Sequence, residues 1–331
     1  MQDIAFSLWC DFIERDFLET GFKALIENRI INGATSNPAI FQQAFLNDSY
    51  KEQKESLKGK DKKEIYEALA ISDIQRAAEL LYPLYEDNPN NGYISIEIDP
   101  NLCDDAKVSI EEGVRLFNAI DYKNVMIKIP ATKAGYDVME ELISRGISIN
   151  ATLVFNKEQV IGCMEALKKG YERLKSTNNI ELKDLPRAVI SVFVSRFDRV
   201  CDEILSKSGI QNATLGIKNA QYLYHLINNY NIPCVRTLFA STGVKGGDLE
   251  ADYYIKELYH SYSINTAPLS AIEAFDESMA KESYLPSTEE LEGFFISVKE
   301  AGVDLDKVSK KLLEQGLSDF KVAFTKILEN L

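Results

Sequence analysis

The sequence predicts an α/β fold, a (β/α)8 barrel with additional helices, forming one domain over residues 1–331. Two patterns carry this prediction: eight short β-type segments recur along the chain, and amphipathic helical segments lie between them. An open, doubly wound sheet is the alternative arrangement of such units. Its usual Gly-x-Gly-x-x-Gly turn after the first strand is absent, which favours the barrel.

The expected strands are residues 6–11, 31–36, 93–98, 124–129, 147–154, 188–194, 234–241 and 261–266. Helical periodicity fills the intervening segments, for example 134–146 and 157–174. Residues 38–92 are too long for a single connection between two strands and predict a helix-rich insert. Residues 287–331 predict two or three more helices, and the sequence leaves open whether these parts form a subunit contact or cover a pocket.

Composition restricts the function. A formal net charge of −14 and a pI near 4.8 argue against a general nucleic-acid binder, although a few local cations can still bind a small anion. Five scattered cysteines without a C-x-x-C motif indicate a reducing compartment. No targeting signal and no long apolar run stand out, so we expect a cytoplasmic protein without a membrane span. His225 and His260 lack ligand spacing, and we expect no metal.

Strand parity predicts where the chemistry lies, because alternate residues of a strand face opposite sides. In 93–98 and 147–154 the apolar residues share one face, which should pack against the helices, and the polar residues share the other, which should point into the barrel. On 124–129 the inward parity carries Lys128. Burying an ammonium group without a partner is costly, which favours the neutral, nucleophilic amine. The alternative is a lysine that reaches out to solvent at the strand end.

Other polar residues at strand ends are candidates for the same pocket. Asp11 and Glu97 would supply an acid or base and a charge partner for the lysine. Hydrogen-bonding groups for sugar hydroxyls or a water would come from Thr35, Asn37, Asn150, Thr152 and Ser191. The segment GATSNP around Thr35 could equally be only a turn.

Two further segments are candidates for binding a phosphate. Arg196 follows the sixth expected strand, and an arginine binds phosphate through two parallel hydrogen bonds. The segment STGVKGG, which begins at Ser241, offers backbone N–H groups, but it lacks the residue order of a Walker A loop.

Taken together, the segments GATSNPAIF, SIEIDP, VMIKIPAT, INATLVF, SVFVSR, GIKNA, TLFASTGVK and SINTAP resemble the transaldolase family, especially its longer bacterial branch. The resemblance covers nearly the whole chain and implies a class I aldolase-like barrel. Such an enzyme needs no cofactor and acts on sugar phosphates of the non-oxidative pentose phosphate pathway, as either a monomer or a homodimer.

The resemblance also implies roles for individual residues. Lys128 matches the Schiff-base lysine, Asp11 the acid/base at the substrate hydroxyl, and Glu97 with Thr152 the pair that holds a proton-shuttling water. Thr35, Asn37, Asn150, Ser191 and Phe193 match substrate-binding positions, and Arg196 and Ser241 match phosphate-binding ones. Many members have an arginine two residues after that serine, where this chain has Gly243, and we infer that Lys245 supplies the second cation instead.

Two functions other than the transfer of a dihydroxyacetone unit between sugar phosphates, which the resemblance implies, stay open at this point. A fructose-6-phosphate aldolase of the same superfamily would release free dihydroxyacetone, but that branch tends to have Gln and Tyr where this chain has Glu97 and Phe193. A barrel that binds sugar phosphates without catalysis would be expected to have lost Lys128 or Asp11, and both are present.

Overall fold

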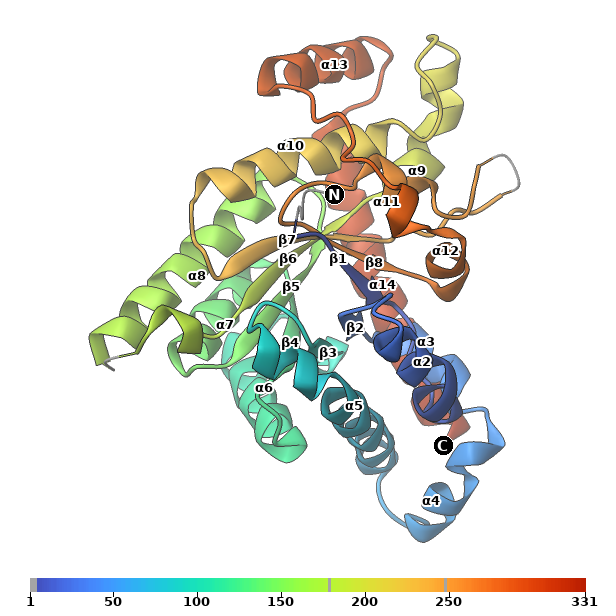
Figure 1. The fold of residues 1–331 in the computed structure, drawn as a ribbon, viewed down its shortest axis with the longest axis vertical. Coiled ribbons are helices and arrows are strands. Elements are labelled where there is room, and N and C mark those ends of the chain that lie inside the picture. The colour runs from blue at the N-terminus through green and yellow to red at the C-terminus, as the bar shows by residue number, and fades with distance from the viewer. Residues whose placement is uncertain (1–4, 178–179, 247–248) are drawn as a thin grey trace.

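The computed structural model describes residues 5–177, 180–246 and 249–331. Within these residues, parallel strands close into a barrel in the order in which they occur in the chain (Figure 1). The strands are β1 (Ser7–Cys10), β2 (Gly33–Thr35), β3 (Tyr93–Glu97), β4 (Val125–Pro130), β5 (Ser148–Val154), β6 (Ala188–Phe193), β7 (Val235–Ala240) and β8 (Ile264–Ala267). The predicted (β/α)8 barrel is therefore confirmed, and the open sheet is excluded because β8 pairs with β1.

One strand begins later than the sequence suggested. The expected segment 261–266 begins as a turn, and β8 itself starts only at Ile264. Tyr262 has a left-handed backbone with a φ of 55°, and the N–H of Ser263 bonds back to the carbonyl of His260. This turn delays the strand, and His260 lies in the loop before β8.

Helices surround the barrel and follow most of its strands. They are α1 (Arg15–Phe17), α2 (Lys23–Glu27), α3 (Pro38–Ala44), α4 (Lys51–Ser56), α5 (Lys62–Asp87), α6 (Ala106–Ile120), α7 (Lys133–Ser144), α8 (Lys157–Thr177), α9 (Ser195–Ser206), α10 (Leu215–Asn229), α11 (Tyr253–Glu257), α12 (Leu269–Ala274), α13 (Thr288–Glu300) and α14 (Leu305–Asn330). A π-helical turn at Leu18–Phe22 joins α1 to α2.

The segment 38–92 is only partly an insertion. Its long helix α5 packs against β3 and α6, so it serves as the barrel's own connection between β2 and β3. Only α3 and α4, with the turn at Asp48–Tyr50, are additional to the barrel pattern.

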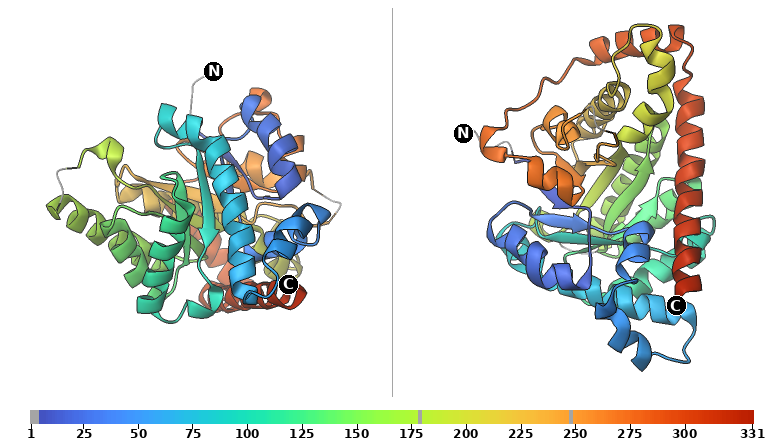
Figure 2. Two further views of the ribbon diagram at one scale, coloured as in Figure 1. Left: turned by 90° about the horizontal axis from the view of Figure 1, so that it is seen from below. Right: turned by 90° about the vertical axis from the view of Figure 1, so that its right-hand side faces the viewer.

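The C-terminal segment forms two helices, because the last two predicted ones merge into the continuous helix α14. This helix crosses the carboxyl ends of the strands, where it contacts α3, β5, α9 and the turn at Pro100–Leu102 (Figure 2). Its approach is close at Gly316, where an added Cβ would lie 2.7 Å from Cδ2 of Leu153. A residue without a side chain therefore lets α14 lie directly on the barrel.

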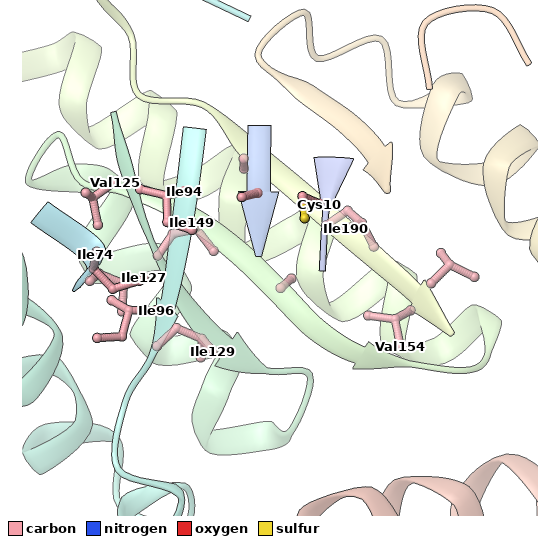
Figure 3. Packing of buried hydrophobic residues seen from close by; sticks show 14 of the residues in the cluster. Cys10, Ile74, Ile94, Ile96, Val125, Ile127, Ile129, Ile149, Val154 and Ile190 are labelled. Carbon is pink, nitrogen blue, oxygen red and sulfur yellow. The ribbon is translucent and has the colours of Figure 1, made fainter. Parts of the chain in front are cut away.

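The two faces of the strands divide the core as parity predicted. Figure 3 shows isoleucines such as Ile94, Ile127 and Ile149 packed outside the barrel, and they belong to the larger apolar cluster together with residues of the surrounding helices. A second cluster contains Trp9 and Met126 inside the barrel and extends to the helices α9, α13 and α14 through residues such as Leu205, Val298 and Leu312. Trp9 fits there because β2 carries Gly33, where a Cβ would lie 2.4 Å from the indole ring.

Parity fails at one residue. The sequence placed Leu153 on the outward face with Ile149 and Ala151, but Leu153 belongs to the inner cluster and its neighbour Val154 to the outer one. The pairing of β5 with β6 shifts register between Ala151 and Val154, and Leu153 has a φ of 57°. Such a bulge turns the following side chains to the other face. As a result Leu153 meets α14 at Gly316.

Candidate active site

Lys128 lies inside the barrel on β4 and is 5% exposed. Its Nζ donates a hydrogen bond to the carbonyl oxygen of Ser36 at 2.8 Å and lies 3.0 Å from Oε1 of Glu97. Glu97 and Lys128 are paired neighbours on β3 and β4, which explains their contact. The lysine is therefore held in the interior by one hydrogen bond and one ion pair, and it does not reach out to solvent.

Glu97 is a buried base next to this amine. Burial raises the pKa of its carboxyl group, and the charge of Lys128 opposes part of that shift. A cavity of about 20 Å³ lies between Glu97, Lys128 and Thr152. Oε2 of Glu97 and Oγ1 of Thr152 are buried and have no hydrogen-bond partner among the described residues. A space of this size holds about one water molecule.

Asp11 follows β1, with its N–H bonded to the carbonyl of Ala267 at the end of β8. Burial raises the pKa of its carboxyl group as well, against the lowering effects of Lys128 and of a hydrogen bond from Thr35. Oγ1 of Thr35 lies 2.6 Å from Oδ1 of Asp11 and 2.7 Å from Oγ1 of Thr266 on β8. The two threonines therefore fix the carboxylate in one orientation.

Other predicted ligands have different surroundings. Asn37 caps α3 through a hydrogen bond that its Oδ1 accepts from the N–H of Ile40 at 3.1 Å, and it also faces the pocket. Asn150 is fully buried: it donates to Oγ of Ser95 at 3.0 Å and accepts from Oγ of Ser191 at 2.6 Å. Asn150 thus lies behind the pocket wall, where it orients Ser191, which does line the pocket.

One end of the pocket is positively charged. Arg196, at the start of α9, lies over the ring of Phe193, with 5.2 Å between the guanidinium carbon and the ring centroid. Its Nη1 is 3.5 Å from Oδ2 of Asp319 on α14. Burial lowers the pKa of Arg196, an effect that Asp319 opposes. Because α9 also begins here, its free N–H groups add to the potential that attracts an anion.

Ser241 follows β7 at the same end of the pocket and has a φ of 57°. Its Oγ lies 3.2 Å from Oγ of Ser195 and 3.5 Å from Nη2 of Arg199. Lys245 is exposed and is not among the residues that line the pocket. The segment STGVKGG ends at Gly247, which lies outside the described residues.

These groups surround a cavity of about 280 Å³ at the carboxyl ends of the strands. Its lining residues come from seven strand ends and from α14, and they are Asp11, Thr35, Asn37, Ala39, Lys128, Thr152, Ser191, Phe193, Arg196, Ala240, Ser241, Thr266, Asp319 and Phe320. Sequence reasoning missed Thr266, Asp319, Phe320 and Arg199. Strand parity on β8 could have found Thr266, whereas nothing in the sequence places α14 over the barrel.

Among residues 5–177, 180–246 and 249–331, no three His, Cys, Asp or Glu side chains gather as a metal would require. His260 is buried, and burial lowers its pKa to about 4. His225 bonds to the carbonyl of Pro286, so both histidines have structural contacts.

Comparison with known proteins agrees with this geometry. The family described as "Transaldolase/Fructose-6-phosphate aldolase" matches residues 8–331. A protein named "Transaldolase" from Campylobacter jejuni subsp. jejuni serotype O:23/36 (strain 81-176) is 50% identical over 331 residues, 98% of this chain and 99% of that protein. Another of that name, from Helicobacter pylori (strain ATCC 700392 / 26695), is 46% identical over 327 residues, again covering 98% and 99%.

Proposed function

The chain belongs to the transaldolase/fructose-6-phosphate aldolase family, and from that premise we propose the reaction and the residues that carry it out. The protein transfers a dihydroxyacetone unit from a ketose phosphate to an aldose phosphate. The donor is sedoheptulose 7-phosphate or fructose 6-phosphate, and the acceptor is glyceraldehyde 3-phosphate or erythrose 4-phosphate. The observation that supports this most is the Lys128 amine inside a closed barrel, with Glu97 at 3.0 Å and Asp11 in the same pocket.

The first step is imine formation at Lys128. The amine must lose a proton before it attacks C2 of the ketose, and Glu97 is the acceptor in contact with it. Because its pKa is raised, Glu97 is a stronger base than an exposed glutamate. After the attack, the C2 hydroxyl leaves as water when a proton returns from Glu97. We assign the small cavity beside Thr152 to a water that carries these protons.

The second step is cleavage of the C3–C4 bond. The carboxylate of Asp11 accepts the C4 hydroxyl proton, and the electron pair of the C3–C4 bond moves into the protonated imine. The aldose phosphate leaves, and the three-carbon enamine stays bound to Lys128. The enamine then attacks the aldehyde of a second aldose phosphate, Asp11 returns the proton, and hydrolysis of the new imine frees the amine. No cofactor enters this sequence, because the imine is the electron sink.

The pocket also supports the choice of phosphorylated substrates. Arg196 and Ser241 lie at one end of the cavity and suit a phosphate group, while Thr35, Asn37 and Ser191 face it with groups that suit sugar hydroxyls. We place the reaction in the cytoplasm, in the non-oxidative pentose phosphate pathway, with the protein acting as a monomer or a homodimer. Among the described residues, no helix is both long and apolar enough to cross a membrane.

Borohydride trapping tests the proposal. Reduction in the presence of fructose 6-phosphate should leave a sugar-derived adduct on the peptide that contains Lys128, as peptide mass spectrometry would show. Lys123→Met, which removes an exposed lysine just before the same strand, is the matched control and should be labelled normally. An adduct on any other lysine, or no adduct, would overturn the mechanism. Accumulation of free dihydroxyacetone without an acceptor would indicate the aldolase instead.

A further inference from the structure

Arg199 on α9 lies beside the phosphate end of the pocket, although no motif of the sequence drew attention to it. Its Nε donates to the carbonyl of Ser195 at 3.3 Å, and its Nη2 lies 3.5 Å from Oγ of Ser241. Ser241 lines the pocket, and Ser195 contacts it from the start of the helix. The guanidinium group of Arg199 is therefore held toward the hydroxyl that we expect to bind the phosphate.

The charges at this end require a second cation. The charge of Arg196 is already partly compensated by Asp319 at 3.5 Å. A sugar phosphate brings nearly two negative charges near neutral pH, so Arg196 alone would leave the bound phosphate poorly balanced. Burial lowers the pKa of Arg196, and the like charge of Arg199 contributes to the same direction. The like charges of Arg196 and Arg199 therefore add at this end of the pocket, and both would attract a bound anion.

The other candidate cation is placed less favourably. Both Lys245 and Arg199 are exposed and lie outside the cavity lining, but of these two described residues only Arg199 has a hydrogen bond to Ser241, at 3.5 Å. A side chain at Gly243, two residues after Ser241, would be confined, because a Cβ there would lie 3.1 Å from Cγ of Pro268. Arg199 reaches Ser241 from within the regular helix α9.

We propose that Arg199 is the second cation of the phosphate site, so that the substrate phosphate binds between Arg196, Arg199 and Ser241. This inference rests on the proposed function and names a specificity-determining residue for it. Arg199 discriminates phosphorylated from unphosphorylated sugars and takes no part in the chemistry at Lys128.

The test compares two donors, fructose 6-phosphate and fructose, with erythrose 4-phosphate as the acceptor. In Arg199→Gln, kcat/KM for fructose 6-phosphate should fall about tenfold or more, because a charged hydrogen bond is lost, while kcat/KM for fructose stays close to its original value. The Ki of inorganic phosphate should rise by a similar factor. Arg199→Lys, which keeps the charge, should restore part of the loss. Lys207→Gln, at the exposed end of α9, is the charge-matched control.

Each other outcome overturns the inference. Equal losses with both donors would mean that Arg199 only supports α9. No loss in Arg199→Gln, or a phosphate-selective loss in Lys245→Gln alone, would assign the second cation to Lys245. Borohydride trapping separates this inference from the proposed function: if the unsubstituted protein forms no adduct at Lys128, the proposed function fails, and if it does, only the role of Arg199 is in question.

Discussion

The two ends of the barrel hold buried cations in opposite ways. At the amino ends of the strands, Arg236 is 5% exposed and donates to Ser7 and to the carbonyl oxygens of Ala5, Asn90, Tyr262 and Ser263. At the carboxyl ends, Lys128 is equally buried but has one hydrogen bond, to Ser36, and one ion pair, with Glu97. Both acids near it have raised pKa values.

The difference indicates that Arg236 stabilises the fold, whereas Lys128 is placed for catalysis. In the part of the chain that the structure describes, Arg236 donates only to neutral acceptors, so its charge is fixed, and its hydrogen bonds hold together the chain segments at the amino end of the barrel. Although burial lowers the pKa of Arg236 to about 10, the group stays charged at neutral pH. A buried amine beside two acids can exchange protons with them, which catalysis requires. Substitutions at the two ends should therefore affect different measurements.

The largest effect is expected at Lys128. Lys128→Met removes the amine that forms the imine, so transfer activity should fall by about 10⁴-fold or more. A coupled assay of glyceraldehyde 3-phosphate formation measures this loss. Far-UV circular dichroism should stay unchanged, and substantial remaining activity would show that another residue carries the reaction.

Asp11→Asn should lower activity by about 10²–10⁴-fold and at the same time stabilise the protein. A raised pKa means that the folded state binds the proton more tightly than the unfolded state. Stability is therefore lost as pH rises from the ordinary value of 3.8 through the folded pKa. Asn removes this cost and can still accept the hydrogen bond from Thr35. We expect a gain of about 1 kcal/mol at pH 7 in urea unfolding, absent at pH 3; a loss of stability at pH 7 would contradict it.

At the other end, Arg236→Met should act on stability alone. The substitution leaves several buried carbonyl oxygens without donors, which should cost about 3 kcal/mol in the free energy of unfolding. Urea unfolding measures the change. The folded fraction should still be trapped at Lys128 by borohydride with normal efficiency. A selective loss of trapping would show that the two ends are coupled.

The smallest effect is expected at Asp319, which is half exposed and therefore forms a weak pair with Arg196. Asp319→Asn removes a charge that competes with the substrate phosphate. The KM for fructose 6-phosphate should fall about two- to fivefold, with little change in kcat. An increase in KM would mean that Asp319 chiefly holds Arg196 in position.

The sequence predicted what depends on local pattern. Alternation along the strands placed Lys128 and Glu97 inside the barrel, and both lie there. It failed at Leu153, because a bulge depends on the pairing of β5 with β6 and not on the residues of β5 alone. It could not find Asp319 or Arg199, because their roles depend on how α14 and α9 lie against the barrel. Helical periodicity shows which face of a helix is apolar, but not which end of the barrel it covers.

The crossing of α14 over the strand ends also has a consequence for biosynthesis. The ribosome completes every barrel strand before it adds Asp319 and Phe320, which form one wall of the cavity. Since chains begin to fold during synthesis, a nascent barrel can hold its nucleophile in place while the binding site is still unfinished. The wall of the cavity that Asp319 and Phe320 form is thus complete only when α14 docks, and the close contact at Gly316 allows it to do so.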